Sequence, residues 1–354
     1  MNILIVGSGL VGRLAAWRLL AAGHEVTILS SDDMTGTDSA GYIAASMIAP
    51  FTEAVTDSKT LRDQGLQSLS LWRHWLAELT TPVFFPQCGT MVVAHSGDQS
   101  ELQRYRLRAE HILEPGDFQR LDKDTVAQYS PALAESFNEA LWFEHEACLD
   151  NRQLFKAIGE MLQKQAEWHQ IPPLTQMDEK SLDKVCREAL HKPFSAFDMT
   201  LDCRGNGSRQ DIADLRSVRG EVLRVHAPEV DIAHCVRLLH PRYPIYLAPR
   251  PNNEYVIGAT VIESADRSDI SVRSAMELLS ALYTIDKGFA EARVLEMRAH
   301  CRPALPDHLP SIRTTSWGYQ INGFYRHGFL LGPYMVSELM TMITEKQDMA
   351  AYAN

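Results

Sequence analysis

The first thirty residues show a regular change in the spacing of apolar positions. Residues 3–6 form a short apolar run rich in β-branched side chains, which predicts a buried strand. A glycine-rich turn follows, and apolar side chains then recur at helical spacing over residues 14–20. Residues 26–29 predict a second strand. The pattern therefore predicts a strand, turn, helix and strand, which is how a parallel α/β sheet begins.

The turn between the first strand and the helix carries the spacing GxGxxG in Gly7, Gly9, Leu10, Val11 and Gly12. Glycines can serve a tight turn alone, but in this context the spacing predicts a dinucleotide site. Gly7 makes the turn, Gly9 lets the backbone approach a pyrophosphate, and Gly12 lets the helix pack on the strand. The helix N-terminus, at Leu10 and Val11, offers free N–H groups and partial positive charge to the phosphates.

One position departs from the usual dinucleotide pattern. An acidic residue normally ends the second strand and holds the ribose hydroxyls, whereas this chain has Ser30 there. Asp32 and Asp33 follow two and three residues later, and no arginine is present to favour a 2′-phosphate. We therefore expect Ser30, or one of these aspartates, to contact the ribose.

Further along the chain the pattern alternates between helical and strand-like segments. Helices are predicted at residues 66–79, 100–111, 153–168 and 271–285, and strands at 88–94 and 196–202. Residues 220–225, 246–250 and 255–260 alternate as antiparallel strands do, with a hairpin turn at residues 251–253. Residues 298–310 and 318–333 are predicted loops, and a last helix is predicted from 334 to 346, directly after Pro333.

Composition limits the function classes. At 354 residues the chain is long enough for two domains, and 45% hydrophobic and 22% charged residues are ordinary for a globular protein. A net charge of −11 argues against nucleic-acid and anionic-membrane partners. With neither a basic leader nor an apolar run approaching ~18 residues, we expect a cytoplasmic protein. Six widely spaced cysteines favour reduced thiols over disulfides or a metal site.

Several later motifs, taken with the glycine turn, resemble one enzyme family. They are residues 44–50 (AASMIAP), 202–205 (DCRG), 218–222 (VRGEV), 246–250 (YLAPR), 256–260 (VIGAT), 301–307 (CRPALPD) and 322–331 (NGFYRHGFLL). The chain resembles the FAD-dependent D-amino-acid oxidase superfamily, and within it the glycine oxidases of thiamine biosynthesis. It departs from them at Ser30, at Ser46 where glycine is usual, and at Gly332 where alanine is favoured.

The resemblance implies an α/β fold (α+β overall) with two interleaved domains. A Rossmann-type FAD-binding domain would comprise residues 1–80, 145–215 and 296–354. An antiparallel-sheet substrate domain would comprise residues 81–144 and 216–295.

The resemblance also implies the site residues. Arg302 is expected to hold the substrate carboxylate, because a guanidinium fork binds a carboxylate bidentately and a lysine would not. Tyr246 would add a hydroxyl, and Arg326 a second cation near the flavin. Without the motif, a lone arginine before Pro303 would more simply be a solvated surface residue. The implied cofactor-binding residues are Gly7, Gly9, Leu10, Val11, Gly12, Ser30, Ala45, Ser46, Met47, Gly205, Arg326, His327, Gly328, Phe329 and Leu330.

The implied activity is oxidation of glycine, with sarcosine and small D-amino acids as further candidates, to the imine while O2 becomes H2O2. The imine would supply thiazole formation, which links the protein functionally to a thiazole synthase. We expect non-covalent FAD, no metal and a homo-oligomer. Three alternatives remain: a sarcosine oxidase-like enzyme or D-amino-acid dehydrogenase with another electron acceptor, an NAD-dependent dehydrogenase, and a flavin-free descendant, which Ser30 would favour.

Overall fold

The predicted strand–turn–helix–strand unit begins the chain. The structure is a computed structural model that describes residues 1–240 and 245–352. In it β1 (Asn2–Val6), α1 (Leu10–Ala21) and β2 (Glu25–Ser30) follow one another, and the two strands pair in parallel. Both faces of β1 are buried, which explains why its apolar run is continuous rather than alternating.

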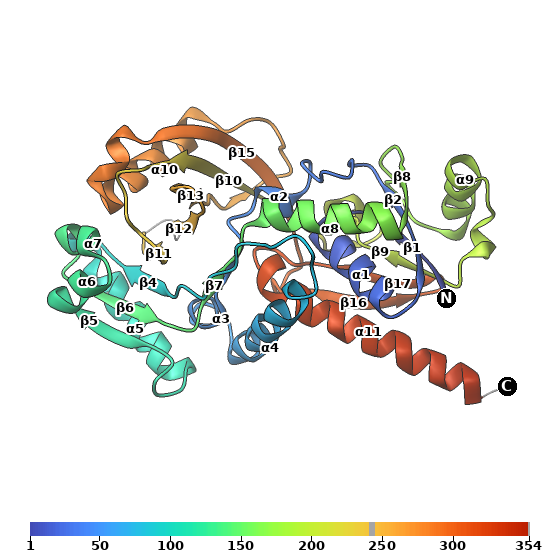
Figure 1. Ribbon diagram of the computed structural model, residues 1–354, viewed down its shortest axis with the longest axis horizontal. Coiled ribbons are helices and arrows are strands. Elements are labelled where there is room, and N and C mark those ends of the chain that lie inside the picture. Colours follow the sequence, from blue (N-terminus) through green and yellow to red (C-terminus); the bar gives the residue numbers. More distant parts are fainter. Residues whose placement is uncertain (241–244, 353–354) are drawn as a thin grey trace.

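A mixed sheet of six strands grows around this unit. Its order is β16 (Ser311–Thr315), β17 (Gly318–Asn322), β9 (Met199–Asp202), β1, β2 and β8 (Glu167–Gln170). Ile3 and Ile5 pack in the same core as α1 and α8 (Asn151–Gln165), whereas Leu4 and Val6 pack with α9 (Glu179–Leu190). The sheet thus has helices on both faces (Figure 1).

A second, larger sheet lies beside the first (Figure 1). Its strands are β14 (Ile262–Glu263), β10 (Arg216–His226), β13 (Glu254–Gly258), β12 (Ile245–Arg250), β11 (Cys235–Leu238), β4 (Thr90–Val93), β6 (Glu139–Phe143) and β5 (Gln119–Asp122), with β15 (Arg293–Ala304) paired to β10. The strands predicted to be antiparallel are so, and the predicted hairpin joins β12 to β13. Only the β11–β4 pair in this sheet is parallel among the described residues.

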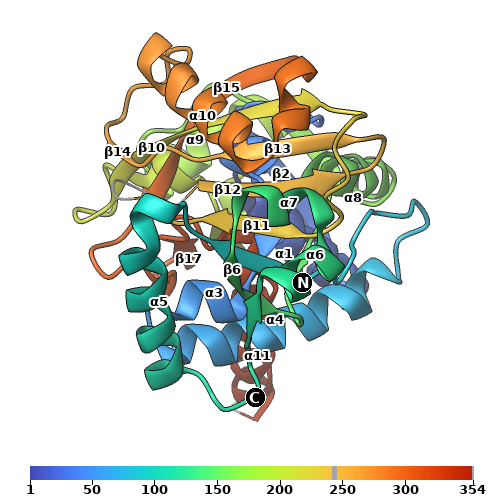
Figure 2. The ribbon, with the colours of Figure 1, turned by 90° about the vertical axis from the view of Figure 1, so that its left-hand side faces the viewer.

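Helices cover one face of the second sheet (Figure 2). They are α6 (Lys123–Tyr129), α7 (Pro131–Ser136) and α10 (Val272–Ile285), and their apolar side chains share a core with the strands. On the opposite face, Val222, Ala248 and Val256 pack in a cluster with residues of the first 50 positions and of β7, namely Ile43, Ala45 and Cys148. This face of the second sheet is therefore turned towards the first sheet and can form one wall of a site between the two sheets.

The remaining elements are short or connect the two sheets. They are α2 (Ala40–Ile43), β3 (Met47–Ile48), α3 (Pro50–Ala54), α4 (Lys59–Leu76), α5 (Gln99–Ile112), β7 (Ala147–Cys148), α11 (Gly328–Tyr352), and the 3-10 turns Ser96–Asp98, Phe194–Ala196, Gly205–Ser208 and Lys287–Glu291. The helix α9 was not predicted from the sequence. Of the described helices, none is both long and apolar enough to cross a membrane.

Several predicted boundaries were wrong. Residues 318–322, predicted as part of a loop, form β17, and α4 begins at Lys59 rather than at residue 66. Residues 298–304 belong to β15 rather than to a loop. Among the described strands β15 pairs with β10 alone, apart from an isolated bridge between Ala304 and Phe324, so Pro303 occupies an edge strand that tolerates a missing N–H. The last helix begins at Gly328, not at residue 334, and Pro333 lies inside it. Because β15 joins the second sheet, that sheet extends past residue 296, the boundary expected from the resemblance.

Candidate active site

A cavity of about 470 Å³ lies at the carboxyl ends of β1, β2 and β9, where open α/β sheets commonly bind ligands. The N-terminal ends of α1 and α11 and the free face of the second sheet complete its wall. The sequence-predicted residues that line it are Gly7, Gly9, Leu10, Val11, Ser30, Ala45, Ser46, Met47, Gly205, Tyr246, Arg302, Arg326, His327, Gly328, Phe329 and Leu330. The fold thus gathers segments from both ends of the chain.

The three glycines of the first turn differ in what surrounds them. Gly7 has φ +101°, and a Cβ there would lie 2.6 Å from the carbonyl oxygen of Cys203. A Cβ at Gly12 would lie 2.0 Å from the carbonyl oxygen of Gly7, so Gly12 packs behind the turn and not in the cavity wall. Gly9 has open space beside it. A ligand can therefore approach the backbone at Gly9.

The first turn of α1 is prepared for an anion. Gly9 caps the helix without a side-chain hydrogen bond, so the first amides of α1, at Leu10 and Val11, have no intrahelical acceptor. The buried Arg13 donates from Nε to the carbonyl oxygen of Ser8 at 2.8 Å, which fixes the turn from behind. A phosphate at this position would gain both hydrogen bonds and the favourable end of the helix dipole.

Ser30 lies in the cavity wall but its hydroxyl already has partners. The Ser30 and Ser8 Oγ atoms are 2.5 Å apart, and the amide of Asp32 donates to Ser30 Oγ at 3.1 Å. Asp32 also lines the cavity, and burial raises the pKa of its carboxyl group. An acidic residue is therefore present near the usual ribose-binding position. It is Asp32, two residues after Ser30.

The turn after β9 forms a second glycine-containing part of the wall. Gly205 has φ +56°, and its carbonyl oxygen accepts a hydrogen bond from Asn322 Nδ2 at 2.9 Å. The buried carboxylate of Asp202 pairs with Arg204 at 2.8 Å, which braces the turn from inside. Burial opposes ionisation of Asp202, yet its pKa is lowered because Arg204 and Gln320 donate to it.

The segment that carries Ala45, Ser46 and Met47 crosses the cavity beside β7. Ser46 has φ +49°, the left-handed region that favours glycine, which accounts for the glycine usual at this position in the resembled family. Its hydroxyl donates to the carbonyl oxygen of Leu149 at 2.6 Å and accepts from Arg250 Nη2 at 2.9 Å. The serine therefore ties this segment both to the chain just after β7 and to β12 of the second sheet.

Arg302 enters the cavity from β15. Its Nη1 donates to the carbonyl oxygens of Thr260 at 3.2 Å and Arg219 at 3.4 Å. The guanidinium lies over Gly220, where a Cβ would be 2.1 Å from Nη2. No carboxylate in the part of the chain that the structure describes pairs with Arg302. The cavity thus contains a cation whose position is fixed by neutral carbonyl groups.

Tyr246 contributes from β12 and lines the same cavity as Arg302. A Cβ added at Gly258 would lie 3.4 Å from Tyr246 Oη and 2.7 Å from Val222 Cγ1, so these side chains meet over Gly258. Val222 is two residues from Gly220 on the same face of β10. A phenol therefore adjoins an apolar side chain in the cavity that the Arg302 cation also lines.

Arg326 lines the cavity, but its guanidinium is committed elsewhere. Its Nε lies 2.8 Å from Glu53 Oε2, and Nη2 donates to Thr56 Oγ1 at 2.9 Å. Burial disfavours the Glu53 carboxylate, but Arg237, Arg326 and His327 lower its pKa to about 2. Burial also lowers the pKa of His327 to about 4, so this imidazole is neutral at pH 7. Arg326 thus carries a paired charge, unlike Arg302.

Two residues important to this geometry were not singled out from the sequence. Gly220 provides the space for Arg302, and a glycine inside a strand pattern was the available signal. Glu53 pairs with Arg326 across the cavity wall, and nothing in its sequence context indicates a buried ion pair.

The donor set fits a dinucleotide that carries a ring system. Two helix N-termini, those of α1 and α11, and the open backbone at Gly9 suit a diphosphate and a second electron-rich group. The wall also contains Ala45, Ile43 and Phe324, apolar groups against which a flat ring can pack. Arg302 and Tyr246 remain for a small anionic molecule.

Comparisons with known proteins agree with this description. Residues 2–341 match the family model described as FAD-dependent oxidoreductase, DAO. The chain is 36% identical over 347 residues, 98% of each protein, to a putative thiamine biosynthesis oxidoreductase ThiO of Rhizobium etli. It is 25% identical to the bifunctional protein ThiO/ThiG of Trichormus variabilis, over 98% of this chain and 53% of that protein.

The fold also has a similar solved structure. Glycine oxidase of Geobacillus kaustophilus superposes with a TM-score of 0.81 at 24% identity, covering 97% of this chain and 94% of that one. This likeness concerns the fold. Because the family model spans nearly the whole sequence and the R. etli protein is similar end to end, the chain belongs to the DAO family of FAD-dependent oxidoreductases.

Proposed function

We propose that this FAD-dependent enzyme oxidises glycine, with sarcosine and small D-amino acids as further candidate substrates, to the imine while O2 is reduced to H2O2. Two electrons and two protons leave the C–N unit of the substrate and reduce one O2 to one H2O2. The observation that carries the proposal is Arg302, a cavity-lining guanidinium without a carboxylate partner among the described residues.

Arg302 would bind the substrate carboxylate. An arginine fork can donate two parallel hydrogen bonds to a carboxylate, and such charge-assisted bonds orient as well as attract. Its Nη1 contacts with the carbonyls of Thr260 and Arg219 hold the guanidinium before substrate arrives. Because no carboxylate of the described residues pairs with Arg302, the substrate need not displace an ion pair there.

The surroundings of Arg302 favour a small substrate. Val222 and Tyr246 lie next to each other over Gly258, and both line the cavity. Tyr246 can add its hydroxyl to the same carboxylate, and Val222 bounds the space where a substrate side chain would extend. Bound FAD would accept the hydride, so the protein need only hold, orient and desolvate the amino acid.

Arg326 would act at longer range. Its guanidinium is held by Glu53 and Thr56, so we assign it to the electrostatics of the cofactor end and not to carboxylate binding. The amides at the start of α11, from Gly328 to Leu330, would face negative charge on the reduced ring. Cys301 donates its thiol to the carbonyls of Ser264 and Asp266, consistent with a non-covalent cofactor.

The names of the relatives support a role in thiamine biosynthesis. The R. etli relative is described as a putative thiamine biosynthesis oxidoreductase. In T. variabilis a similar segment is fused to ThiG in one bifunctional protein. A reactive imine passed to a partner enzyme is the chemistry that such a fusion would serve, so we infer a functional link to a thiazole synthase.

The decisive experiment measures glycine-dependent peroxide formation together with flavin content in Arg302 variants. Arg302→Lys keeps the charge but loses the planar fork, and should lower kcat/KM by roughly tenfold to a hundredfold. Arg302→Ala should cost more, because a substrate carboxylate would be buried without a partner. The flavin spectrum should stay normal in both.

The matched control is Arg293→Lys, an exposed arginine at the other end of the same strand. It should leave kcat/KM unchanged. Full activity in Arg302→Ala would refute the carboxylate assignment. Normal glycine oxidation coupled only to a dye, without peroxide, would identify a dehydrogenase instead of an oxidase.

A further inference from the structure

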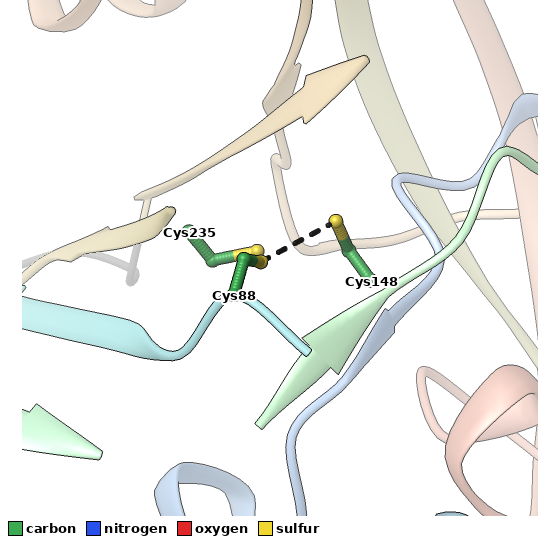
Figure 3. A group of neighbouring side chains, drawn as sticks. All are labelled: Cys88, Cys148 and Cys235. Carbon is green, nitrogen blue, oxygen red and sulfur yellow. Dashed lines mark hydrogen bonds between the residues drawn. The ribbon is translucent and has the colours of Figure 1, made fainter. Parts of the chain in front are cut away.

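Three cysteines that are far apart in the sequence meet in the interior. Cys88 precedes β4, Cys148 ends β7 and Cys235 begins β11 (Figure 3). Their Sγ atoms all lie within 4.8 Å of one another. Cys148 and Cys235 are fully buried, and Cys88 is partly exposed. The sequence predicted no metal site because it contains no closely spaced pair of cysteines. The fold brings together three cysteines that are distant in the sequence.

Backbone hydrogen bonds hold the three cysteines in this arrangement. The amide of Cys148 donates to the carbonyl oxygen of Pro86 at 3.3 Å, and that of Cys235 donates to Gly89 at 3.1 Å. The segment that carries Cys88 is therefore fixed between β7 and β11. The thiols converge because three separate strands or segments are bonded side by side, and not through a flexible loop.

The spacing of the sulfur atoms suits metal coordination. Cys88 Sγ and Cys148 Sγ are 3.8 Å apart. A metal–sulfur bond of about 2.3 Å in tetrahedral geometry separates two ligand sulfurs by about 3.8 Å. A cation between the three sulfurs would therefore need little movement of the protein.

We propose that Cys88, Cys148 and Cys235 bind a thiophilic d10 cation, with zinc(II) as the ion to test, and leave a fourth coordination position for a solvent molecule. Thiolate ligands select such soft or borderline cations over calcium or magnesium. The partly exposed Cys88 provides the route by which the ion enters. Binding would deprotonate the thiols and release protons to solvent.

The site would lie behind the wall of the flavin cavity. Cys148 is paired with Met47 in the β3–β7 ladder, and Met47 lines the cavity. Cys148 and Cys235 also share an apolar cluster with Val222, and Tyr246 packs against this cluster. A bound ion would thus tie together β7, β11 and the segment before β4, and stabilise the folded state according to its concentration.

The test uses the purified FAD-containing protein, first freed of metal and kept reduced. Titration against a chromophoric zinc chelator should show one zinc(II) per chain, and cobalt(II) should give thiolate-to-metal absorption and visible bands beyond the flavin spectrum. Removing a residue that only hydrogen-bonds to a metal ligand lowers metal affinity about tenfold to a hundredfold. Cys88→Ser changes a proposed ligand itself, so it should lower the zinc affinity by at least about tenfold. At the same zinc concentration, Tm should rise less in Cys88→Ser than in the wild type.

Cys186→Ser is the matched control, because Cys186 is buried in α9 among other apolar side chains, outside the cluster. It should bind zinc(II) as the wild type does. Zinc should also protect three thiols from a thiol reagent in the native protein. Unchanged affinity in Cys88→Ser, or an intact mass two hydrogens lower than expected and hence a disulfide in the cluster, would overturn the proposal. Neither readout depends on glycine oxidation.

Discussion

The indole N–H of Trp72 donates to the carbonyl oxygen of Phe329 at 2.8 Å. In a regular helix this carbonyl would accept from residue 333, but Pro333 has no N–H. The next amide, that of Tyr334, donates to Ser68 Oγ at 3.0 Å. Side chains of α4 thus provide hydrogen-bond partners for backbone groups of α11 next to Pro333. These groups lie close to the end of α11 that lines the cavity.

Trp72→Phe should destabilise the protein by about 1–3 kcal/mol, because it leaves a buried carbonyl without a donor. Urea unfolding measures the effect, with Trp75→Phe as a control for loss of a buried indole. In a Pro333→Ala background, the new amide can donate to Phe329, so Trp72→Phe should cost less. Equal costs in the two backgrounds would show that the hydrogen bond does not compensate for Pro333.

Ser46 combines a costly backbone conformation with two side-chain hydrogen bonds. Ser46→Ala keeps the left-handed backbone but loses the bonds to Leu149 and Arg250, and should destabilise by roughly 2–3 kcal/mol. Ser46→Gly loses the same bonds but removes a backbone cost of about 1–2 kcal/mol. The glycine variant should therefore unfold at higher urea concentration than the alanine variant. The reverse order would contradict this account.

Ser30→Glu should bind FAD about tenfold more tightly than the wild type. Hydrogen bonds to a charged group contribute ~1.5–3 kcal/mol against ~1 kcal/mol for neutral pairs, and the Ser30 hydroxyl is already engaged with Ser8. Ser30→Gln is the control, with the same length and no charge, and should gain less. Flavin fluorescence titration of apoprotein measures the dissociation constants. Equal constants for all three proteins would show that Asp32 or other groups already hold the ribose.

Glu146 should make stability fall as the pH rises through its titration range. Burial raises its pKa to about 7, although the Thr52 amide and hydroxyl donate to the carboxyl group. Between an ordinary value near 4.5 and about 7, the folded state binds more protons than the unfolded state. Its contribution to the free energy of unfolding therefore decreases by up to about 1.4 kcal/mol per pH unit in that window.

Glu146→Gln removes this titration, so the difference in stability between variant and wild type should shift in favour of the variant from pH 5 to pH 7. Both proteins contain His327, so its contribution to the pH dependence of stability cancels when the two are compared. Burial lowers the pKa of His327 to about 4, so its contribution increases with pH between 4 and 6.5. Denaturant unfolding at several pH values measures the difference. A difference that does not vary with pH would mean that Glu146 stays ionised in the folded protein.

Local patterns predicted the elements whose residues contact near neighbours. The unit from β1 to β2, the helices α4, α5 and α10, and the β12–β13 hairpin were all recognised from spacing and turn residues. The start of α11 was misplaced, because Pro333 is tolerated only where α4 provides a replacement donor. That donor is 257 residues away in sequence, and no local pattern contains it.

The sequence alone determined the family, the parallel dinucleotide-binding start of the fold and the residues offered to the site, because glycine spacing and motif residues are local properties. Only the tertiary structure decided how those residues act. Among the described residues it left Arg302 without a carboxylate partner and paired Arg326 with Glu53, although both are arginines in motifs. It also brought together Cys88, Cys148 and Cys235. Charge pairing and thiol convergence depend on distances between segments, and those distances exist only after the two sheets have packed.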